Sequence, residues 1–349
     1  MSQQPMSHRV FIERLVIAIA ILGLALLLWA LRGLLILVFG AVLVAVILSL
    51  IAHPLKKRPG LPDWAALLTA VLVVAGLFAF AFWLFGAETA RQASALREAI
   101  PAAWQALLQR LEPIGLAEPL RQGMAGMQSG GSGGVLTNIG RFVMSVGGGI
   151  ADAVLVIVGG IYLAAQPRLY RSGLLKLFPP GSRDQVEQAL DDSWTALRLW
   201  LAGRLVSMVF IGLLTGIGLW ALGIPGALAL GVVAFILEFV PFVGPIISAV
   251  PAILLALAFD PVKALWVAGL YLGIQQLEGN VIEPIVQQRA VDLPPALLLF
   301  AIVAGALIFG PTGVIFAAPL TVVLFVMVKR LYVRDALQTA TDIPGEKKT

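Results

Sequence analysis

The sequence predicts an all-α fold, a polytopic membrane helix bundle with about eight hydrophobic segments. Two observations lead to this prediction. Of the 349 residues, 60% are hydrophobic and only 12% are charged, whereas a soluble domain carries roughly twice that share of charge. Apolar runs of 18 or more residues, the length that crosses a hydrocarbon core, recur along the chain. The lipid bilayer is therefore the first partner that we expect.

The composition also argues against several classes of function. The chain contains no cysteine and only two histidines, His8 and His53, both expected near span ends. This argues against thiolate chemistry, a histidine metal site and a serine–histidine hydrolase, so we expect no cofactor, no metal and no enzymatic activity. A GxxxxGK[ST] phosphate loop is absent from the sequence. The net charge of +5 reports membrane topology and not nucleic-acid binding.

The N-terminal part contains the first four expected spans. Lys56, Lys57 and Arg58 follow the second span, and the positive-inside rule places this loop and the N-terminus in the cytoplasm. The first apolar run is expected to be a retained span and not a signal peptide, because another span follows it at once. The four spans are expected at about 11–30, 33–52, 64–86 and 142–165.

Two hydrophilic segments separate the spans. Residues 87–141 combine an amphipathic helical part with a Gly/Ser-rich linker, and we expect them outside the cytoplasm as a surface cap or an oligomer contact. Residues 166–198 are expected in the cytoplasm. Ser182 and Gln185 have capping-box spacing there, and apolar residues then recur at helical spacing. The pattern predicts an amphipathic helix at the membrane surface that leads into a fifth span at about 199–222.

The C-terminal part repeats itself. The stretch IPGALALGVVAFI at 224–236 is similar to LPPALLLFAIVAG at 293–305, so that Pro225 matches Pro294 at an offset of 69 residues. Each stretch then reaches a Gly-Pro pair, and later a proline followed by an apolar run. Hydrophobic segments interrupted by Gly and Pro at matching places in two halves indicate a transporter binding site.

Each repeat unit is expected to be one span followed by a helical hairpin, with the hairpins at 225–258 and 294–328. The charge pattern inverts one unit relative to the other, and Lys329 and Arg330 end the chain in the cytoplasm. Charge does not distinguish re-entrant hairpins from spanning ones. The expected segments are 1–86, 87–141, 142–165, 166–198, 199–261, 262–330 and 331–349.

The stretch LEFVPFVGP, residues 237–245, places a carboxylate, two prolines and a glycine inside an apolar run. Prolines break helices, and within lipid such breaks occur where protein or a water-filled cavity surrounds them. Glu238 lies one turn before the break, where it can meet a cation, a proton or a polar substrate. The residues expected at hairpin tips and helix breaks are Pro241, Gly244, Pro245, Pro251, Pro284, Gly310, Pro311, Gly313 and Pro319.

A second polar stretch, QQLEGNVIEP, occupies residues 275–284. At 3.6 residues per turn, one helical stripe carries Gly269, Gly273, Gln276, Asn280 and Glu283. Gln275 and Glu278 lie off this stripe, where they face a second helix or the cytoplasmic interface. The residues expected to line a substrate or ion path are Glu238, Gln275, Gln276, Glu278, Asn280 and Glu283.

Three of these stretches match motifs of one family. Glu238 to Pro245 matches E-x-[IV]-P-[YF]-[IV]-G-P, Glu278 to Pro284 resembles the motif that closes the penultimate span, and Phe309 to Pro319 matches F-G-x-x-G-x-x-x-x-x-P. The chain thereby resembles the autoinducer-2 exporter (AI-2E) family of PerM-type permeases, strongly over about 170–330. The resemblance implies an oligomeric, multi-pass permease of the bacterial inner membrane.

From this resemblance we expect a secondary transporter that exports a small polar solute such as autoinducer-2, with the opposed hairpins moving against the first four spans. Two alternatives remain open. A Na⁺(Li⁺)/H⁺ antiporter would use Glu238 or Glu283 as its proton site and lose coupled transport on Glu→Gln. A non-transporting envelope scaffold would act through residues 87–141 and lose its phenotype when that segment is deleted.

Overall fold

The computed structural model describes residues 8–56, 62–80, 83, 112, 118, 150–284 and 293–343. Throughout these residues the regular secondary structure is helical, which confirms the predicted all-α class. Residues 87–141, expected outside the cytoplasm, lie outside the described part apart from Glu112 and Glu118, so their predicted roles stay predictions.

The first two predicted spans are the helices α1 (His8–Ala30) and α2 (Arg32–Lys56). The third begins as a helix at Asp63–Phe80, and the described part of the fourth is α6 (Ile150–Ala165). Length and hydropathy allow four of the described helices to cross a membrane, or five when α6 is joined to α7 (Pro167–Leu175) across their 90° bend. The chain is thus a polytopic helical membrane protein, while the count of about eight hydrophobic segments includes shorter apolar helices.

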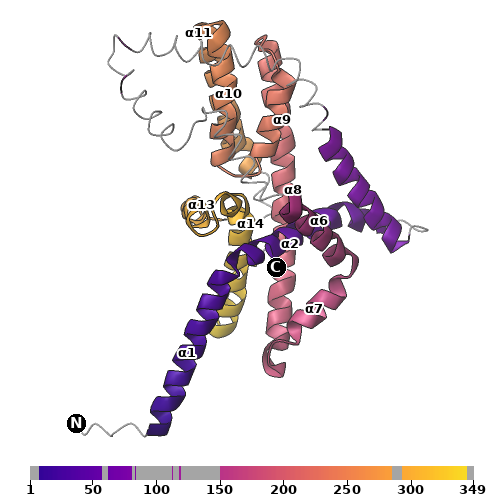
Figure 1. The fold of residues 1–349 in the computed structure, drawn as a ribbon. Helices are drawn as coiled ribbons and strands as arrows, with labels where there is room; N and C mark the ends of the chain where they lie inside the picture. The colour runs from indigo at the N-terminus through magenta and orange to yellow at the C-terminus, as the bar shows by residue number, and fades with distance from the viewer. Residues whose placement is uncertain are drawn as a thin grey trace.

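The longest helix, α8 (Arg183–Ala221), forms the axis of the molecule (Figure 1). The boundary predicted at 198/199 does not interrupt it, so the predicted amphipathic segment and the predicted fifth span are parts of one helix of 39 residues, about 58 Å long at 1.5 Å per residue. Continuity follows from the absence of proline between Pro180 and Pro225. The amphipathic part packs on protein: Leu197 and Leu201 share a buried cluster with Leu43 and Val46 of α2.

The predicted hairpin at 225–258 is present as α9 (Ala227–Leu237) and α10 (Val243–Phe259), which we call hairpin 1. Its tip is a tight turn in which the Gly244 N–H donates to the Val240 carbonyl at 2.9 Å. A Cβ on Gly244 would lie 2.0 Å from the Leu237 carbonyl oxygen, so only glycine fits. Phe242 has φ 63°, a strained conformation for a bulky residue.

The second predicted hairpin is α13 (Pro295–Phe309) and α14 (Pro311–Met327), which we call hairpin 2. Gly310 forms the turn with φ 66° and ψ −147°, a region that essentially only glycine adopts. The two arms touch through their backbones, because a Cβ on Gly313 would lie 2.0 Å from the Gly305 carbonyl oxygen. The helix runs past the predicted boundary at 328 through the π-helical η4 (Val328–Ala336).

Not every proline that was expected at a helix break interrupts a helix. Pro251 lies inside α10 and Pro319 inside α14, and both helices continue through them. A proline removes one backbone hydrogen bond, and neighbouring helices satisfy the freed group within a packed bundle. Pro241, Gly310 and Pro311 do lie at or beside a hairpin turn. Gly244 and Pro245 lie in the first turn of α10.

Helix length favours a re-entrant hairpin 1. The 11 residues of α9 span about 16 Å, about half of a hydrocarbon core. In hairpin 2, by contrast, the continuous helix Pro311–Ala336 has 26 residues and is long enough to cross. The inverted relation of the two repeat units stays a prediction.

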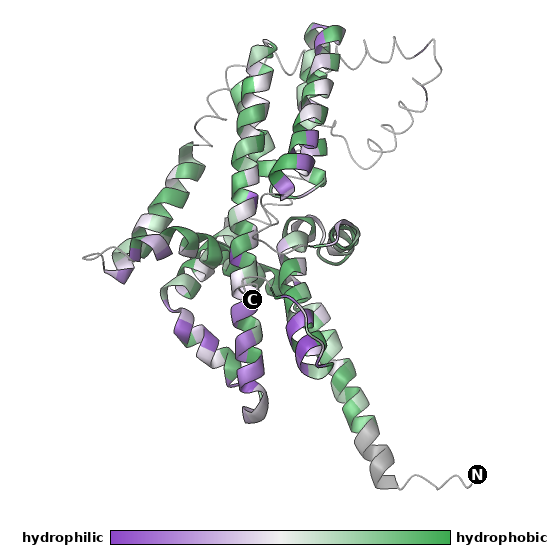
Figure 2. Ribbon diagram, turned by 180° about the vertical axis from the view of Figure 1, so that it is seen from behind, coloured by the Kyte–Doolittle hydropathy of each residue, from purple (hydrophilic) through white to green (hydrophobic). Residues whose placement is uncertain are grey.

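The hydrophilic residues gather toward one end of the molecule. Figure 2 shows them on α7, on the N-terminal part of α8 and on η4. There Arg330 Nη1 lies 3.5 Å from Asp192 Oδ2, joining η4 to α8, and the Arg330 guanidinium also donates to the Gln188 side chain. Arg171 of α7 pairs with Glu187 and Asp191 of α8. These pairs tie three segments together at this end.

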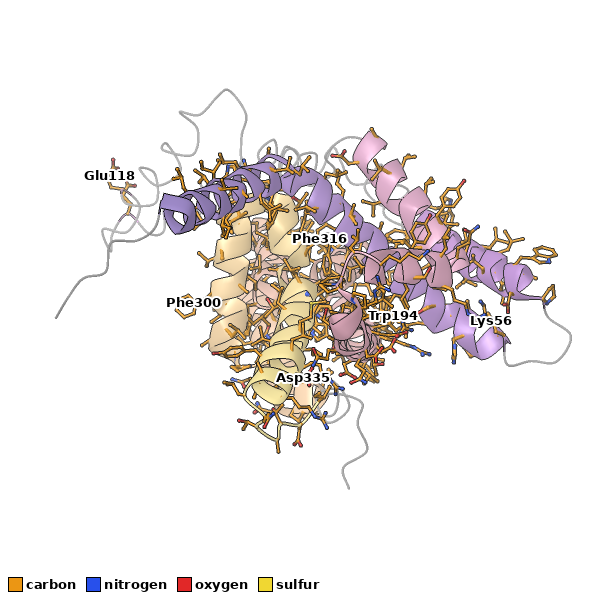
Figure 3. The ribbon with its side chains drawn as sticks, turned by 90° about the horizontal axis from the view of Figure 1, so that it is seen from below. Lys56, Glu118, Trp194, Phe300, Phe316 and Asp335 are labelled. Atoms are coloured by element: carbon orange, nitrogen blue, oxygen red, sulfur yellow. The ribbon has the colours of Figure 1, made fainter. Side chains whose placement is uncertain are left out.

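The N-terminal helices meet the rest of the bundle through α2. Phe316 of α14 meets Phe39 of α2 edge to face, with ring centroids 6.3 Å apart, at the crossing of these helices (Figure 3). Phe300 of α13 points away from the bundle in the same view and is 75% exposed. The helix α1 extends away from the other helices (Figure 1), and its apolar side chains from Leu15 onward are exposed.

The hairpin 1 tip gives a direct test of this fold. Gly244→Ala should destabilise the protein by about 1–3 kcal/mol, because the new methyl group overlaps a backbone carbonyl that cannot move aside. The thermal melting of detergent-purified protein measures the effect. Gly269→Ala is the matched control, since a Cβ at Gly269 meets nothing within 4 Å. Equal melting of the two variants would contradict the described tip.

Candidate functional site

A buried cluster of charges connects hairpin 1 to two long helices. Arg204 Nη2 donates to Glu238 Oε1 at 2.6 Å, and Arg204 Nη1 donates to Glu278 Oε1 at 3.1 Å. The Glu238 side chain is 1% exposed, that of Glu278 10% and that of Arg204 11%. Gln275 Nε2 donates to Glu278 Oε2 at 2.9 Å. We call these four residues the charge cluster.

The three charged members of the cluster come from three different helical segments. Arg204 lies near the middle of α8. Glu238 is the residue at which α9 ends, directly before the turn of hairpin 1. Glu278 follows α11 (Pro261–Leu277) and opens the π-helical turn η3 (Glu278–Ile282). A π-helical turn re-aims the side chains at a helix end and is frequent at functional sites.

The two carboxylates of the cluster differ in their hydrogen bonding. Both oxygens of Glu278 accept a hydrogen bond, one from Arg204 and one from Gln275. Glu238 accepts through Oε1 alone, and its Oε2 is buried without a hydrogen-bond partner, as is Arg204 Nε. An unpaired buried polar atom costs about 1–3 kcal/mol. Such an atom in a membrane protein marks a position that binds something or changes its state.

A groove runs between α8 and the α11–η3 segment. Its volume is about 740 Å³, and it is open to the outside of the chain. Asn280 Nδ2 donates to Gln276 Oε1 at 3.0 Å, so these two amides form a pair on the groove wall. The other walls are apolar. The lining residues are Leu214, Ile217, Gly218, Leu270, Gly273, Ile274, Gln276, Leu277, Asn280 and Val281.

The residues of 275–284 therefore divide between the two features. Glu278 contacts Arg204 of α8, which is the second helix that the sequence left open, and Gln275 donates to Glu278. Gln276 and Asn280 of the predicted stripe line the groove. Glu283 lies past η3 and is exposed, and Pro284 follows it at the end of the described segment. The sequence pattern thus placed the polar residues on two faces, and in the structure each face has a different neighbour.

Sequence reasoning missed Arg204. The residue lies inside the predicted fifth span at 199–222, and an arginine within a span is as unusual as the carboxylate of Glu238. That signal was sufficient to single it out. Its pairing with Glu238 and Glu278 required the fold, because the three residues are 34 to 74 positions apart in the sequence.

The charge cluster gives a stability test. Arg204→Met should cost about 3–5 kcal/mol, because it leaves two buried carboxylates without their cation. Adding Glu238→Gln and Glu278→Gln should restore much of that loss, since the charges then disappear together. Thermal melting in detergent is the measurement, with Arg198→Met on the same helix as the control. Wild-type melting of Arg204→Met would contradict a buried ionic cluster.

Comparison with known proteins places this architecture in a family. The sequence model described as "AI-2E family transporter" matches residues 15–332, nearly the whole chain. A candidate transport protein of Bacillus subtilis, YrrI, is 32% identical over 167 residues, which cover 48% of this chain and 47% of that protein. The match to YrrI thus spans about half of that relative.

Two other relatives match over most of their length. A candidate transport protein of Mycobacterium tuberculosis, MT0215, is 26% identical over 317 residues, covering 84% of this chain and 82% of the relative. The AI-2 transport protein TqsA of Escherichia coli is 24% identical over 295 residues, covering 81% and 82%. With the family model spanning both repeat units and the spans before them, the chain belongs to the AI-2E family of transporters.

Proposed function

We propose that this protein is a secondary transporter that exports a small, uncharged polar solute, and that autoinducer-2 is the first solute to test. The observation that carries the proposal is the groove between α8 and the α11–η3 segment, with its pair of amides on an otherwise apolar wall. Small-molecule sites commonly combine mostly apolar walls with a few placed polar groups.

The chemistry of the groove favours an uncharged ligand with hydroxyl or carbonyl groups. Gln276 offers its Nε2 hydrogens as donors, and Asn280 offers Oδ1 as an acceptor, because the bond between them uses the other two groups. The lining residues include no charged side chain. The name of the Escherichia coli relative gives AI-2 as what that protein transports, which makes it the first candidate here.

The position of the groove supports a moving site. It lies between α8, which contacts both hairpins, and the α11–η3 segment, whose Glu278 is connected to hairpin 1 through Arg204. A shift of hairpin 1 must break or carry along the charge cluster, and α8 and η3 border the groove. We infer that solute access alternates when the hairpins move against the first four spans.

The groove predicts a loss of transport without a loss of folding. Replacing both amides, Gln276→Leu with Asn280→Leu, should lower autoinducer-2 flux in proteoliposomes by about tenfold, because two polar contacts of roughly 0.7 kcal/mol each are removed. Both residues are exposed, so melting should stay at the wild-type value. Trp266→Leu is the control, since Trp266 is an exposed residue of α11 outside the groove.

The outcomes separate clearly. The groove is supported as the solute site if the wild type transports autoinducer-2, the double variant transports it about tenfold more slowly, and the control is unaffected. If the double variant transports autoinducer-2 as fast as the wild type, the solute path lies elsewhere. If the wild-type protein moves no autoinducer-2 but transports a related polyhydroxylated solute, the groove remains the proposed site and the proposed solute is wrong.

A further inference from the structure

We propose that Glu238 holds an exchangeable proton at Oε2, and that its release and return accompany each transport step. The proton site stands on the geometry of the charge cluster alone. Its coupling to solute movement rests on the proposed function.

The charges of the cluster do not balance when every group is ionised. The cluster sets one guanidinium against two carboxylates, so full ionisation leaves one negative charge in excess. An unbalanced charge in a membrane interior is costly, and it is relieved by a bound proton or cation. One proton makes the cluster neutral.

The hydrogen bonds of the cluster favour Glu238 over Glu278 as the residue that carries this proton. Glu278 already accepts a hydrogen bond at each oxygen, which is the pattern of an ionised carboxylate. Glu238 leaves Oε2 unpartnered although its side chain is 1% exposed. A proton on Glu238 Oε2 therefore supplies the donor that the site lacks.

The described surroundings of Glu238 contain few other ionisable groups. The packed helices α9 and α10 carry no other ionisable residue. On α11, the Tyr271 hydroxyl donates to the Ser248 carbonyl at 3.1 Å, and Lys263 lies near Gly223, at the far end of α8 from its hydrophilic N-terminal part. Among the described residues that pack on the hairpin 1 tip, Arg204 and Glu278 are thus the charged groups that face Glu238.

The proton on Glu238 influences the position of the hairpin 1 tip. Glu238 directly precedes the turn that contains the strained Phe242, so its attachment to Arg204 holds the tip of hairpin 1 on α8. Loss of the proton leaves an uncompensated buried charge at this attachment point. The tip then gains free energy by moving to where Glu238 meets water, and it returns when the carboxyl group is reprotonated.

The count of charges makes a sharp prediction for infrared spectroscopy. pH-difference spectra of the purified, reconstituted protein should show the C=O stretch of one protonated carboxyl group near neutral pH, and the band should disappear on alkalinisation. Glu238→Gln and Glu278→Gln should each abolish it, because either variant leaves one carboxylate paired with Arg204. Glu187→Gln, which removes an exposed carboxylate of α8, should leave the band unchanged.

Conservative variants assign the proton to one residue. Glu238→Asp should shift the band, because the proton then sits on a different carboxyl group, whereas Glu278→Asp should leave it in place. Arg204→Met, if it folds, should increase the band by leaving two carboxylates without a cation. A band that is missing in the wild type near neutral pH, or that survives Glu238→Gln, would overturn the proton site.

Flux measurements test the coupling separately. Proteoliposomes that contain a pH dye should report proton movement when autoinducer-2 is added, and Glu238→Gln should abolish that movement. An infrared band with no solute flux would keep the proton site and reject the proposed solute. Solute flux with the same pH dependence in the wild type and Glu238→Gln would overturn the coupling.

Discussion

The paired attachment of one arginine to two carboxylates organises this protein. Through its two ion pairs, Arg204 connects α8 to both the tip of hairpin 1 and the end of α11. Within a bilayer the hydrophobic effect does not distinguish one apolar neighbour from another, because lipid is as apolar as leucine. Polar contacts and close backbone packing therefore decide which helices belong together. The charge cluster supplies the first, and the glycine contacts of the hairpins supply the second.

A buried charge cluster contributes little to the stability of the fold, but it suits a contact that forms and breaks. Two well-packed apolar side chains would hold α8 and hairpin 1 together without the cost of desolvating three charges. A charged attachment has a different property, since its strength depends on what else is bound near it. The unpartnered oxygen of Glu238 shows that the arrangement is not optimised as a static contact.

The sequence predicted much of this structure, for identifiable reasons. The helical class followed from run length and charge, and both hairpins followed from glycine and proline at matching places, because these residues act on their own backbone. The continuity of α8 through residue 198 was missed, because an amphipathic pattern does not say whether its apolar stripe meets lipid or protein. The expectation that prolines break helices was wrong at Pro251 and Pro319, where the helices continue.

The candidate site was predicted in part. The sequence singled out Glu238, Gln275 and Glu278 because polar side chains are rare in apolar helices, but their common partner Arg204 depends on contacts between distant segments. Helical periodicity did separate Gln276 and Asn280 from Gln275 and Glu278, and the structure assigns the two pairs to the groove and to the charge cluster. Periodicity describes one helix correctly and leaves open which neighbour each face meets.

The unbroken length of α8 has a mechanical meaning. One rigid rod carries the pairing of Asp192 with Arg330 near its start, Arg204 at its centre and the groove wall at Leu214 to Gly218 near its end. A rod without a hinge does not absorb a displacement locally. A change in how its hydrophilic end packs is therefore transmitted along the helix to the wall of the groove, which we propose as the solute site.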